Sequence, residues 1–130
     1  MRDLITAAME ARVKAYAPYS KFYVGAAMRD EKGRIHSGCN IENAAYPQGW
    51  CAETSAISHL IRAGGTSIAE IVVIGNGYGL CTPCGGCRQK IREFAKGDVK
   101  IHCCTEDGDV VQSFTLEKLL PASFEPENLK

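Results

Sequence analysis

The stretch Ile71-Val72-Val73-Ile74 decides the fold class of this 130-residue chain. Successive side chains of a strand point to opposite faces, so four consecutive β-branched residues leave neither face suited to water. The run therefore predicts a strand in the middle of a layered sheet, buried on both sides.

Helical and strand patterns lie on both sides of this run. Strands mixed with helices, without an internal repeat or linker, predict one α/β domain over residues 1–130. Three helices with recognisable end signals are expected: from Asp3 as N-cap to Ala17-Pro18, from about Trp50 to Arg62 before Gly64-Gly65, and from Thr82 and Pro83 to about Phe94. A further short helix is expected after Phe114, before a tail that contains proline. Four further strands are expected at Phe22–Arg29, Arg34–Asn40, about Val99–Cys103 and Val110–Phe114.

The charge balance limits the partners of the chain. The chain has fifteen basic and fifteen acidic residues, and it has no dense block of Lys and Arg. The sequence therefore lacks the basic surface that binds a phosphate backbone. The sequence also lacks an apolar run of about 18 residues and an N-terminal export signal. These features predict a cytoplasmic protein with a small, weakly charged partner, and neither a nucleic acid nor a membrane.

Seven cysteines are an odd number for a chain of this kind and argue against a disulfide framework. Metal ligation together with buried free thiols fits the number better. Cys39, Cys103 and Cys104 lie in expected strands, where a free cysteine behaves as a small buried hydrophobe.

Two short motifs predict a catalytic zinc site. Cys84 and Cys87 are three residues apart at the start of an expected helix, so both sulfurs lie on one face and the helix dipole favours thiolates. Cys51 starts another helix and can supply a third sulfur, which leaves the fourth tetrahedral position of zinc open to water. Glu53, two residues after Cys51, would point past the metal to that water and carry protons to and from it.

Cys81 keeps a second interpretation open. Cys81, Cys84 and Cys87, joined by Cys51 or Cys104, could form a closed four-thiolate zinc site or hold an iron–sulfur cluster. Glu53 would then be an ordinary first-turn glutamate that meets the helix dipole.

Five segments of the chain carry further motifs: Phe22-Tyr23-Val24-Gly25-Ala26-Ala27, Asn40-Ile41-Glu42-Asn43-Ala44-Ala45-Tyr46, Cys51-Ala52-Glu53, Pro83-Cys84-Gly85-Gly86-Cys87-Arg88-Gln89 and Leu119-Leu120-Pro121-Ala122-Ser123-Phe124. In order and over nearly the whole chain, these segments resemble the small homotetrameric cytidine deaminases. The resemblance implies a three-layer α-β-α domain with a central mixed five-stranded sheet, one Zn²⁺ per subunit and a homotetramer that acts in pyrimidine salvage.

The resemblance also implies the reaction. Cytidine or deoxycytidine would be hydrolysed to uridine or deoxyuridine with release of ammonia, as zinc-bound hydroxide attacks C4 of the pyrimidine. Glu53 would take the water proton, deliver it to N3 and help protonate the leaving ammonia. Cys51, Cys84 and Cys87 would be the metal ligands.

The remaining site residues follow from the same resemblance. Asn40 and Glu42 would bind the ribose hydroxyls, which would separate a nucleoside enzyme from a free-base enzyme. Phe22 would pack on the cytosine ring, and Ala52 would present backbone groups to it. Tyr46 and Phe124 would lie where neighbouring subunits meet at the sites.

Thr54 departs from the pattern. Many relatives carry an arginine there, which donates to a zinc-bound cysteine and offsets the charge of three thiolates. A neutral hydroxyl cannot supply that charge, and Arg88, beside Cys87, is a candidate substitute. A deaminase of another aminopyrimidine nucleoside, such as an antibiotic, and a structural metal-binding module remain as alternative functions.

Overall fold

The computed structural model describes residues 1–130 and contains one mixed five-stranded sheet in the order β2-β1-β3-β4-β5. β3 and β4 are parallel, and the other neighbouring pairs are antiparallel. The mixed five-stranded sheet that the sequence predicts is confirmed. The strands are β1 (Gly25–Asp30), β2 (Ile35–Cys39), β3 (Ile68–Ile74), β4 (Lys100–Cys104) and β5 (Val110–Thr115).

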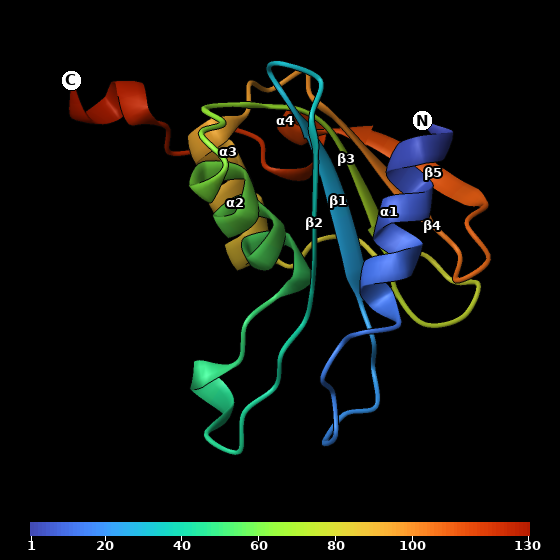
Figure 1. Cartoon of the computed structure of the whole chain (residues 1–130). Helices are drawn as coiled ribbons and strands as arrows, with labels where there is room; N and C mark the ends of the chain where they lie inside the picture. The colour runs from blue at the N-terminus through green and yellow to red at the C-terminus, as the bar shows by residue number, and fades with distance from the viewer.

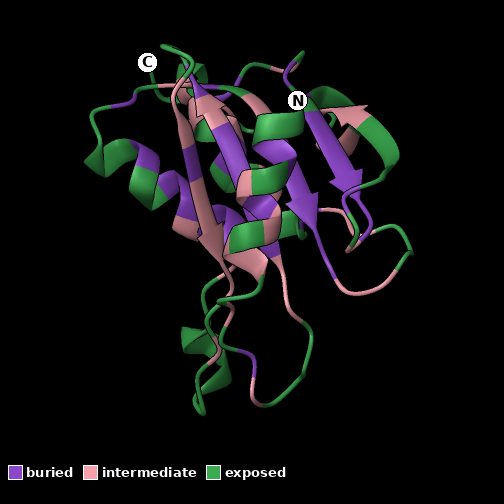
Figure 2. Ribbon diagram, turned by 45° about the vertical axis from the view of Figure 1, so that its right-hand side comes forward, coloured by how far each residue is buried: buried purple, intermediate pink, exposed green.

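β3 lies at the centre of the sheet and is buried on both faces, as its β-branched run predicts. Ile71 and Val73 belong to the larger apolar cluster on one face, whereas Val72 and Ile74 belong to a smaller cluster on the other. Figure 2 shows the buried residues concentrated in the central strands and on the inner sides of the helices.

Helices cover the two faces unequally (Figure 1). α1 (Arg2–Arg12) packs alone on one face and buries Leu4, Ile5 and Ala8. α2 (Ala52–Arg62), α3 (Gly85–Phe94) and the short α4 (Leu116–Leu119) contribute to the large cluster on the other face. The result is the three-layer α-β-α arrangement. None of these helices combines the length and the hydrophobicity that a membrane span requires.

Two glycines allow the helices to approach the sheet closely. A Cβ atom at Gly25 would lie 2.2 Å from the backbone oxygen of Ala8 in α1, and one at Gly38 would lie 2.5 Å from the backbone nitrogen of Ala56 in α2. Both distances are far below van der Waals contact, so any larger residue would push a helix away from the sheet.

Three helix boundaries predicted from the sequence are wrong. α1 begins after Met1 as N-cap, with Asp3 in its first turn, and ends at Arg12 because the chain turns away and Tyr16 pairs with Ile41 as a β-bridge. α3 begins at Gly85, since Cys84 has an extended backbone with φ −67° and ψ 166° and is itself the N-cap.

β1 is shorter at its start than predicted. Residues 22–24 lie outside the ladder, because β2 and β3 end opposite Gly25. Two loops, residues 13–24 and 40–51, project from this end of the sheet, at the bottom of Figure 1. The N-termini of α2 and α3 open toward the same end, so this is where the predicted site residues meet.

Candidate active site

Three cysteines come together between two helix starts, and they form the one cluster of potential metal ligands in the structure. Cys51 is the N-cap of α2, Cys84 is the N-cap of α3, and Cys87 lies in the first turn of α3. Neither N-cap sulfur binds the backbone of its own helix. All three sulfurs therefore face one point at the positive ends of two helix dipoles, where thiolates are favoured.

The spacing of the three sulfurs fits a zinc ion. They lie within 4.8 Å of one another, and Cys51 and Cys84 are 4.0 Å apart. Sulfurs that bind one tetrahedral zinc at about 2.3 Å are about 3.8 Å apart, so small side-chain rotations would close the site. Cys81 and Cys104 are not in this cluster, and a closed four-cysteine site is therefore not formed.

The thiols of Cys51 and Cys87 have pKa values that are shifted in opposite directions. A hydrogen bond from Cys87 lowers the pKa of the Cys51 thiol to about 6, although burial opposes this shift. The same bond raises the pKa of Cys87 above its usual range, and burial adds to that effect. The cluster thus already stabilises one thiolate at neutral pH.

Glu53 lies one residue into α2 and is buried, with 4% of its surface exposed. Burial raises the pKa of its carboxyl to about 7, and the negative charge of Cys51 contributes in the same direction. Such a carboxyl can hold or release a proton close to neutral pH. It does not belong to the metal cluster, so Glu53 stands beside the ligands rather than among them.

The residues behind the cysteines differ in what they contact. The hydroxyl of buried Thr54 lies 3.9 Å from the sulfur of Cys87. The guanidinium of Arg88 donates instead to three oxygens, those of the Pro83 and Leu119 carbonyls and of the Thr82 hydroxyl. The positive charge of Lys90, whose ammonium lies 5.4 Å from the centre of the Trp50 ring, contributes to the lowered pKa of Cys51.

A cavity of about 190 Å³ opens directly onto Glu53 and two of the cysteines. It brings together four residues that the sequence predicts to bind substrate or metal from separate segments: Phe22, Asn40, Ala52 and Cys84. Its complete lining is Phe22, Val24, Asn40, Cys51, Ala52, Glu53, Cys81, Thr82 and Cys84. Cys81, for which the sequence offered only a ligand role, is part of this wall.

Asn40 follows β2 and is tied to the segment that carries Phe22. Its amide nitrogen donates to the Phe22 carbonyl at 2.8 Å, and its oxygen accepts from the Val24 amide at 2.9 Å. Asn40 therefore fixes the cavity wall as well as lining it.

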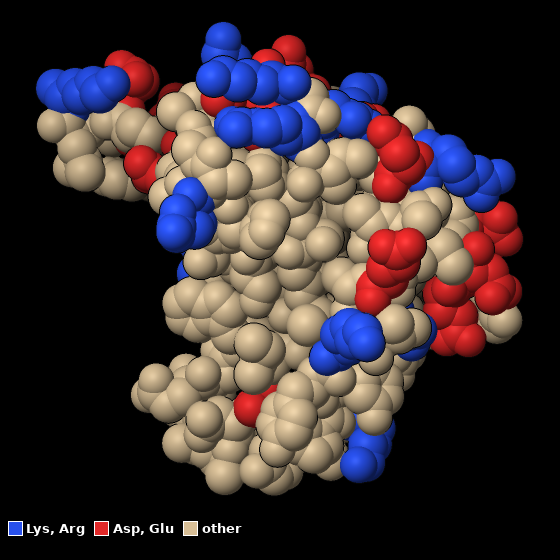
Figure 3. Space-filling view, viewed as in Figure 1, with Lys and Arg blue, Asp and Glu red and all other residues tan.

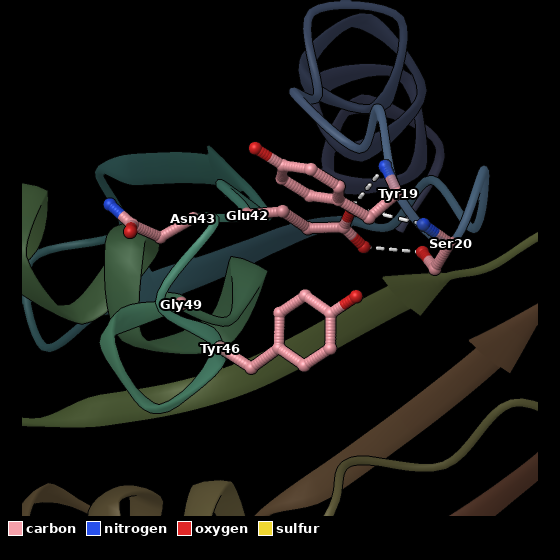
Figure 4. A pocket seen from close by; sticks show the side chains of 6 residues that line it. All are labelled: Tyr19, Ser20, Glu42, Asn43, Tyr46 and Gly49. Atoms are coloured by element: carbon pink, nitrogen blue, oxygen red, sulfur yellow. Dashed lines mark hydrogen bonds between the residues drawn. The ribbon is translucent and has the colours of Figure 1, made fainter.

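Glu42 lies in a neighbouring cavity of about 320 Å³, which is shown in Figure 4. Its carboxylate accepts hydrogen bonds from the backbone amides of Tyr19 and Ser20, at 2.9 and 3.1 Å, and from the Ser20 hydroxyl. These bonds lower the pKa of Glu42. The carboxylate thus stays charged at neutral pH, and it lies between the loop of residues 19–20 and the Tyr46 ring.

The two residues predicted to serve neighbouring subunits are both exposed. Tyr46 starts the short 3₁₀ helix η1 (Tyr46–Gln48) and has 75% of its surface exposed. Phe124 lies in the C-terminal tail with 57% exposed, and its carbonyl accepts from the side chain of Gln89.

Comparisons with known proteins identify the family. Residues 1–103 match the model of the "Cytidine and deoxycytidylate deaminase zinc-binding region". The chain belongs to this deaminase family. It is 43% identical over 129 residues to a cytidine deaminase of Sporosarcina psychrophila, covering 99% of this chain and 94% of that protein. A cytidine deaminase of Halalkalibacterium halodurans is 38% identical over 126 residues, covering 97% and 95%.

Solved deaminase structures share the fold. The crystal structure of cytidine deaminase from Burkholderia pseudomallei superposes with a TM-score of 0.87 at 42% identity, covering 95% of this chain and 98% of that one. The zinc-binding family model and the named relatives show that the chain is a zinc-dependent deaminase, and the single cluster of Cys51, Cys84 and Cys87 could hold one zinc ion.

Proposed function

We propose that this deaminase hydrolyses cytidine and deoxycytidine to the corresponding uridines with release of ammonia, and that residues 1–130 act as one catalytic domain. The observation that carries the proposal is the cavity of about 190 Å³, which is lined by Glu53, by Cys51 and Cys84 of the cysteine cluster, and by Phe22 and Asn40. Relatives of high coverage that are named cytidine deaminases support the same substrate.

Zinc bound by Cys51, Cys84 and Cys87 would supply Lewis acidity, which lowers the pKa of water toward neutrality. Glu53 would hold the proton that this water loses and pass it to N3 of the pyrimidine, and later to the leaving amine. The apolar cavity wall around Glu53 would exclude other water. Ala52, buried at the first turn of α2, would meet the ring with its backbone.

Recognition of the nucleoside would fall to Phe22 and Asn40 in this cavity and to Glu42 in the neighbouring one. Phe22 would pack against the base, and Asn40 and Glu42 would bind the sugar hydroxyls. A carboxylate offers about four acceptor positions, and the three donors of Tyr19 and Ser20 leave capacity for a hydroxyl. A free base would leave these polar groups without a partner, and its turnover should therefore be slower.

We further propose a homotetramer that works in pyrimidine salvage. The part of the molecule around η1 carries several exposed aromatic side chains, among them Tyr19, Tyr46 and Trp50. Figure 3 shows that most charged side chains of this view gather at the top and right, whereas the lower part is mostly uncharged. Neighbouring copies would cover this surface and bring Tyr46 and Phe124 to adjacent sites. Seven free cysteines suit a reducing compartment such as the cytoplasm.

The proposal is tested by following the ultraviolet absorbance of cytidine, deoxycytidine and cytosine with the zinc-loaded protein. We expect turnover of both nucleosides, at least about tenfold lower kcat/KM for cytosine, and loss of about 10³-fold in kcat for Glu53→Ala. Cytidine turnover that survives Glu53→Ala would refute the role of Glu53. Turnover of another aminopyrimidine nucleoside, without cytidine turnover, would refute the substrate assignment.

A further inference from the structure

The segment Phe22–Val24 lies between β1 and the start of the chain's turn at Lys21, and it lines the cavity with Phe22 and Val24. Its backbone makes no hydrogen bond to other backbone on the side of β3 and a single one on the side of β2. β2 and β3 both end opposite Gly25, where the ladders pair it with Cys39 and Ile74. Beyond that point the one backbone bond is from the Asn40 amide to the Val24 carbonyl, at 3.2 Å. The segment that carries Phe22 must therefore be held by side chains.

Two asparagines take the place of the missing strands. On the β2 side, the carboxamide of Asn40 bridges the Phe22 carbonyl and the Val24 amide. On the β3 side, the carboxamide of Asn76 bridges the Lys21 carbonyl and the Tyr23 amide, both at 2.9 Å. In each case the carboxamide nitrogen donates to a backbone carbonyl, and the carboxamide oxygen accepts from the backbone amide two residues later, as a neighbouring strand would do. The two carboxamides hold the backbone on both sides of Phe22.

Asn76 is itself held in place from outside the cavity. Arg12 of α1 donates to the Asn76 oxygen at 2.7 Å and to the Tyr23 carbonyl at 3.0 Å. The Arg12 guanidinium lies 3.6 Å from the carboxylate of Glu106, which also accepts from the Gly77 amide at 2.6 Å. Two donors, from Arg12 and Tyr23, meet the same oxygen, so the orientation of the carboxamide is fixed by its partners.

The bond to Lys21 falls at an unfavourable backbone conformation. Lys21 has φ of 59°, in the left-handed region that non-glycine residues rarely occupy. The chain reverses there before it enters the segment Phe22–Val24. Without Asn76, neither the Lys21 carbonyl nor the Tyr23 amide has another partner, and the turn before Phe22 can relax.

We propose that Asn76 is a positioning residue for the deaminase, which sets the Phe22 ring against the substrate without touching it. Asn76 does not line the cavity, whereas Phe22 does. The inference rests on the proposed function, in which Phe22 packs on the pyrimidine. It adds a residue from the loop after β3, stabilised by α1, to the determinants of substrate binding.

The test compares Asn76→Ala and Asn76→Asp with a matched control, Glu31→Ala. Asn76→Asp keeps the acceptor for Tyr23 and Arg12, and it replaces the donor to the Lys21 carbonyl with a charged oxygen. Glu31 accepts from the amides of Thr66 and Ser67 at the opposite end of β1, so Glu31→Ala removes two similar bonds far from the cavity. Each variant is measured for kcat and KM with cytidine, and for hydrogen exchange of the Tyr23 amide.

We expect Asn76→Ala to lower kcat/KM about tenfold, mainly through KM, because Phe22 binds substrate and transition state alike. Asn76→Asp should lose less, and Glu31→Ala should stay within about twofold of the wild type. Exchange at Tyr23 should accelerate at least about tenfold in Asn76→Ala. In a Phe22→Ala background, Asn76→Ala should have almost no further effect on KM.

An equal effect of Asn76→Ala with and without Phe22, or unchanged exchange at Tyr23, would overturn the inference. If Asn76→Ala fails to fold, Asn76→Asp decides by the same two measurements. A folded, zinc-loaded wild-type protein without cytidine turnover would refute the proposed function instead. Exchange at Tyr23 would then still support or overturn the role of Asn76 in ordering this segment.

Discussion

The inner and outer ends of the proposed substrate site are built differently. At the inner end, Cys51, Glu53 and Cys87 stand on the first turns of α2 and α3, whose other turns are anchored in the large apolar cluster by residues such as Leu60 and Ile91. At the outer end, the loops of residues 13–24 and 40–51 are mostly exposed. They are held by backbone bonds, such as those of Tyr16 with Asn40 and Glu42, and by side-chain hydrogen bonds to the backbone.

The two ends differ because one serves the chemical reaction and the other serves substrate binding and release. Groups that carry out chemistry must keep their geometry within a fraction of an ångström, and packed helices provide that rigidity. Loops with few buried contacts open at lower free energy, which suits the entry and exit of a substrate. Changes at the inner end should therefore reduce metal content and kcat, and changes at the outer end should chiefly raise KM.

The largest effect should come from Cys84→Ser at the inner end. A neutral hydroxyl is a poor ligand compared with a thiolate, so zinc content should fall from one per chain to near zero, and kcat should fall by at least about 10³-fold. Zinc is measured by elemental analysis of the purified protein. The matched control is Cys81→Ser, since Cys81 lines the same cavity outside the cluster. Equal zinc loss in both variants would mean that the cluster has a fourth thiolate.

Glu42→Gln should have an intermediate effect at the outer end. The variant keeps the size of the side chain but replaces one acceptor oxygen with a donor, which faces the donors of Ser20 and the sugar. We expect KM for cytidine to rise by about 10-fold to 100-fold and kcat to change by less than about threefold. A fall in kcat at constant KM would contradict the division between the two ends. Glu31→Gln, with the same chemical change in a distant turn, is the control.

Acidification should break the hydrogen bonds of Glu42 at the outer end. The bond from the Ser20 hydroxyl, together with the amides of Ser20 and Tyr19, lowers the pKa of Glu42 below its ordinary 4.5. These bonds are therefore complete above that value and are lost as the pH falls through the lowered pKa. The Ser20 amide chemical shift, followed from about pH 7 to about pH 3, should show a midpoint below 4.5. The transition should be absent in Glu42→Gln, and a midpoint at or above 4.5 in the native protein would argue against these bonds.

The sequence predicts the inner end well and the outer end less well. Strand β3, helix α2 and the three-cysteine cluster follow from local signals: a β-branched run, a glycine stop and ligand spacing. Asn76 has no such signal, because Asn76-Gly77 resembles an ordinary turn. Its partner Tyr23 lies 53 residues away and becomes its neighbour only through the register of β1 with β3. Likewise, the early end of α1 depends on the long-range pairing of Tyr16 with Ile41.

The smallest effect is expected for Thr54→Arg. This variant tests whether the inner end needs a positive charge to offset the three thiolates. Three thiolates on one zinc dication leave a formal charge of minus one, and the Thr54 hydroxyl, 3.9 Å from the Cys87 sulfur, offsets it only weakly. An arginine would have room in the adjacent cavity of about 360 Å³, which is lined by Gln89, Lys90 and Glu93 among others. Its guanidinium could then donate to Cys87 and draw charge from the thiolate.

Because helix dipoles and Lys90 already favour the thiolates, this added charge should change kcat by less than about tenfold and leave folding and zinc content intact. Thr54→Val, which removes the hydroxyl but keeps the shape, should lower kcat by a similarly small factor. The measurements are kcat with cytidine and zinc retention against a competing chelator. Loss of zinc from Thr54→Arg would show that the inner end depends on a neutral residue at this position, and that its rigidity leaves no room for the larger cation.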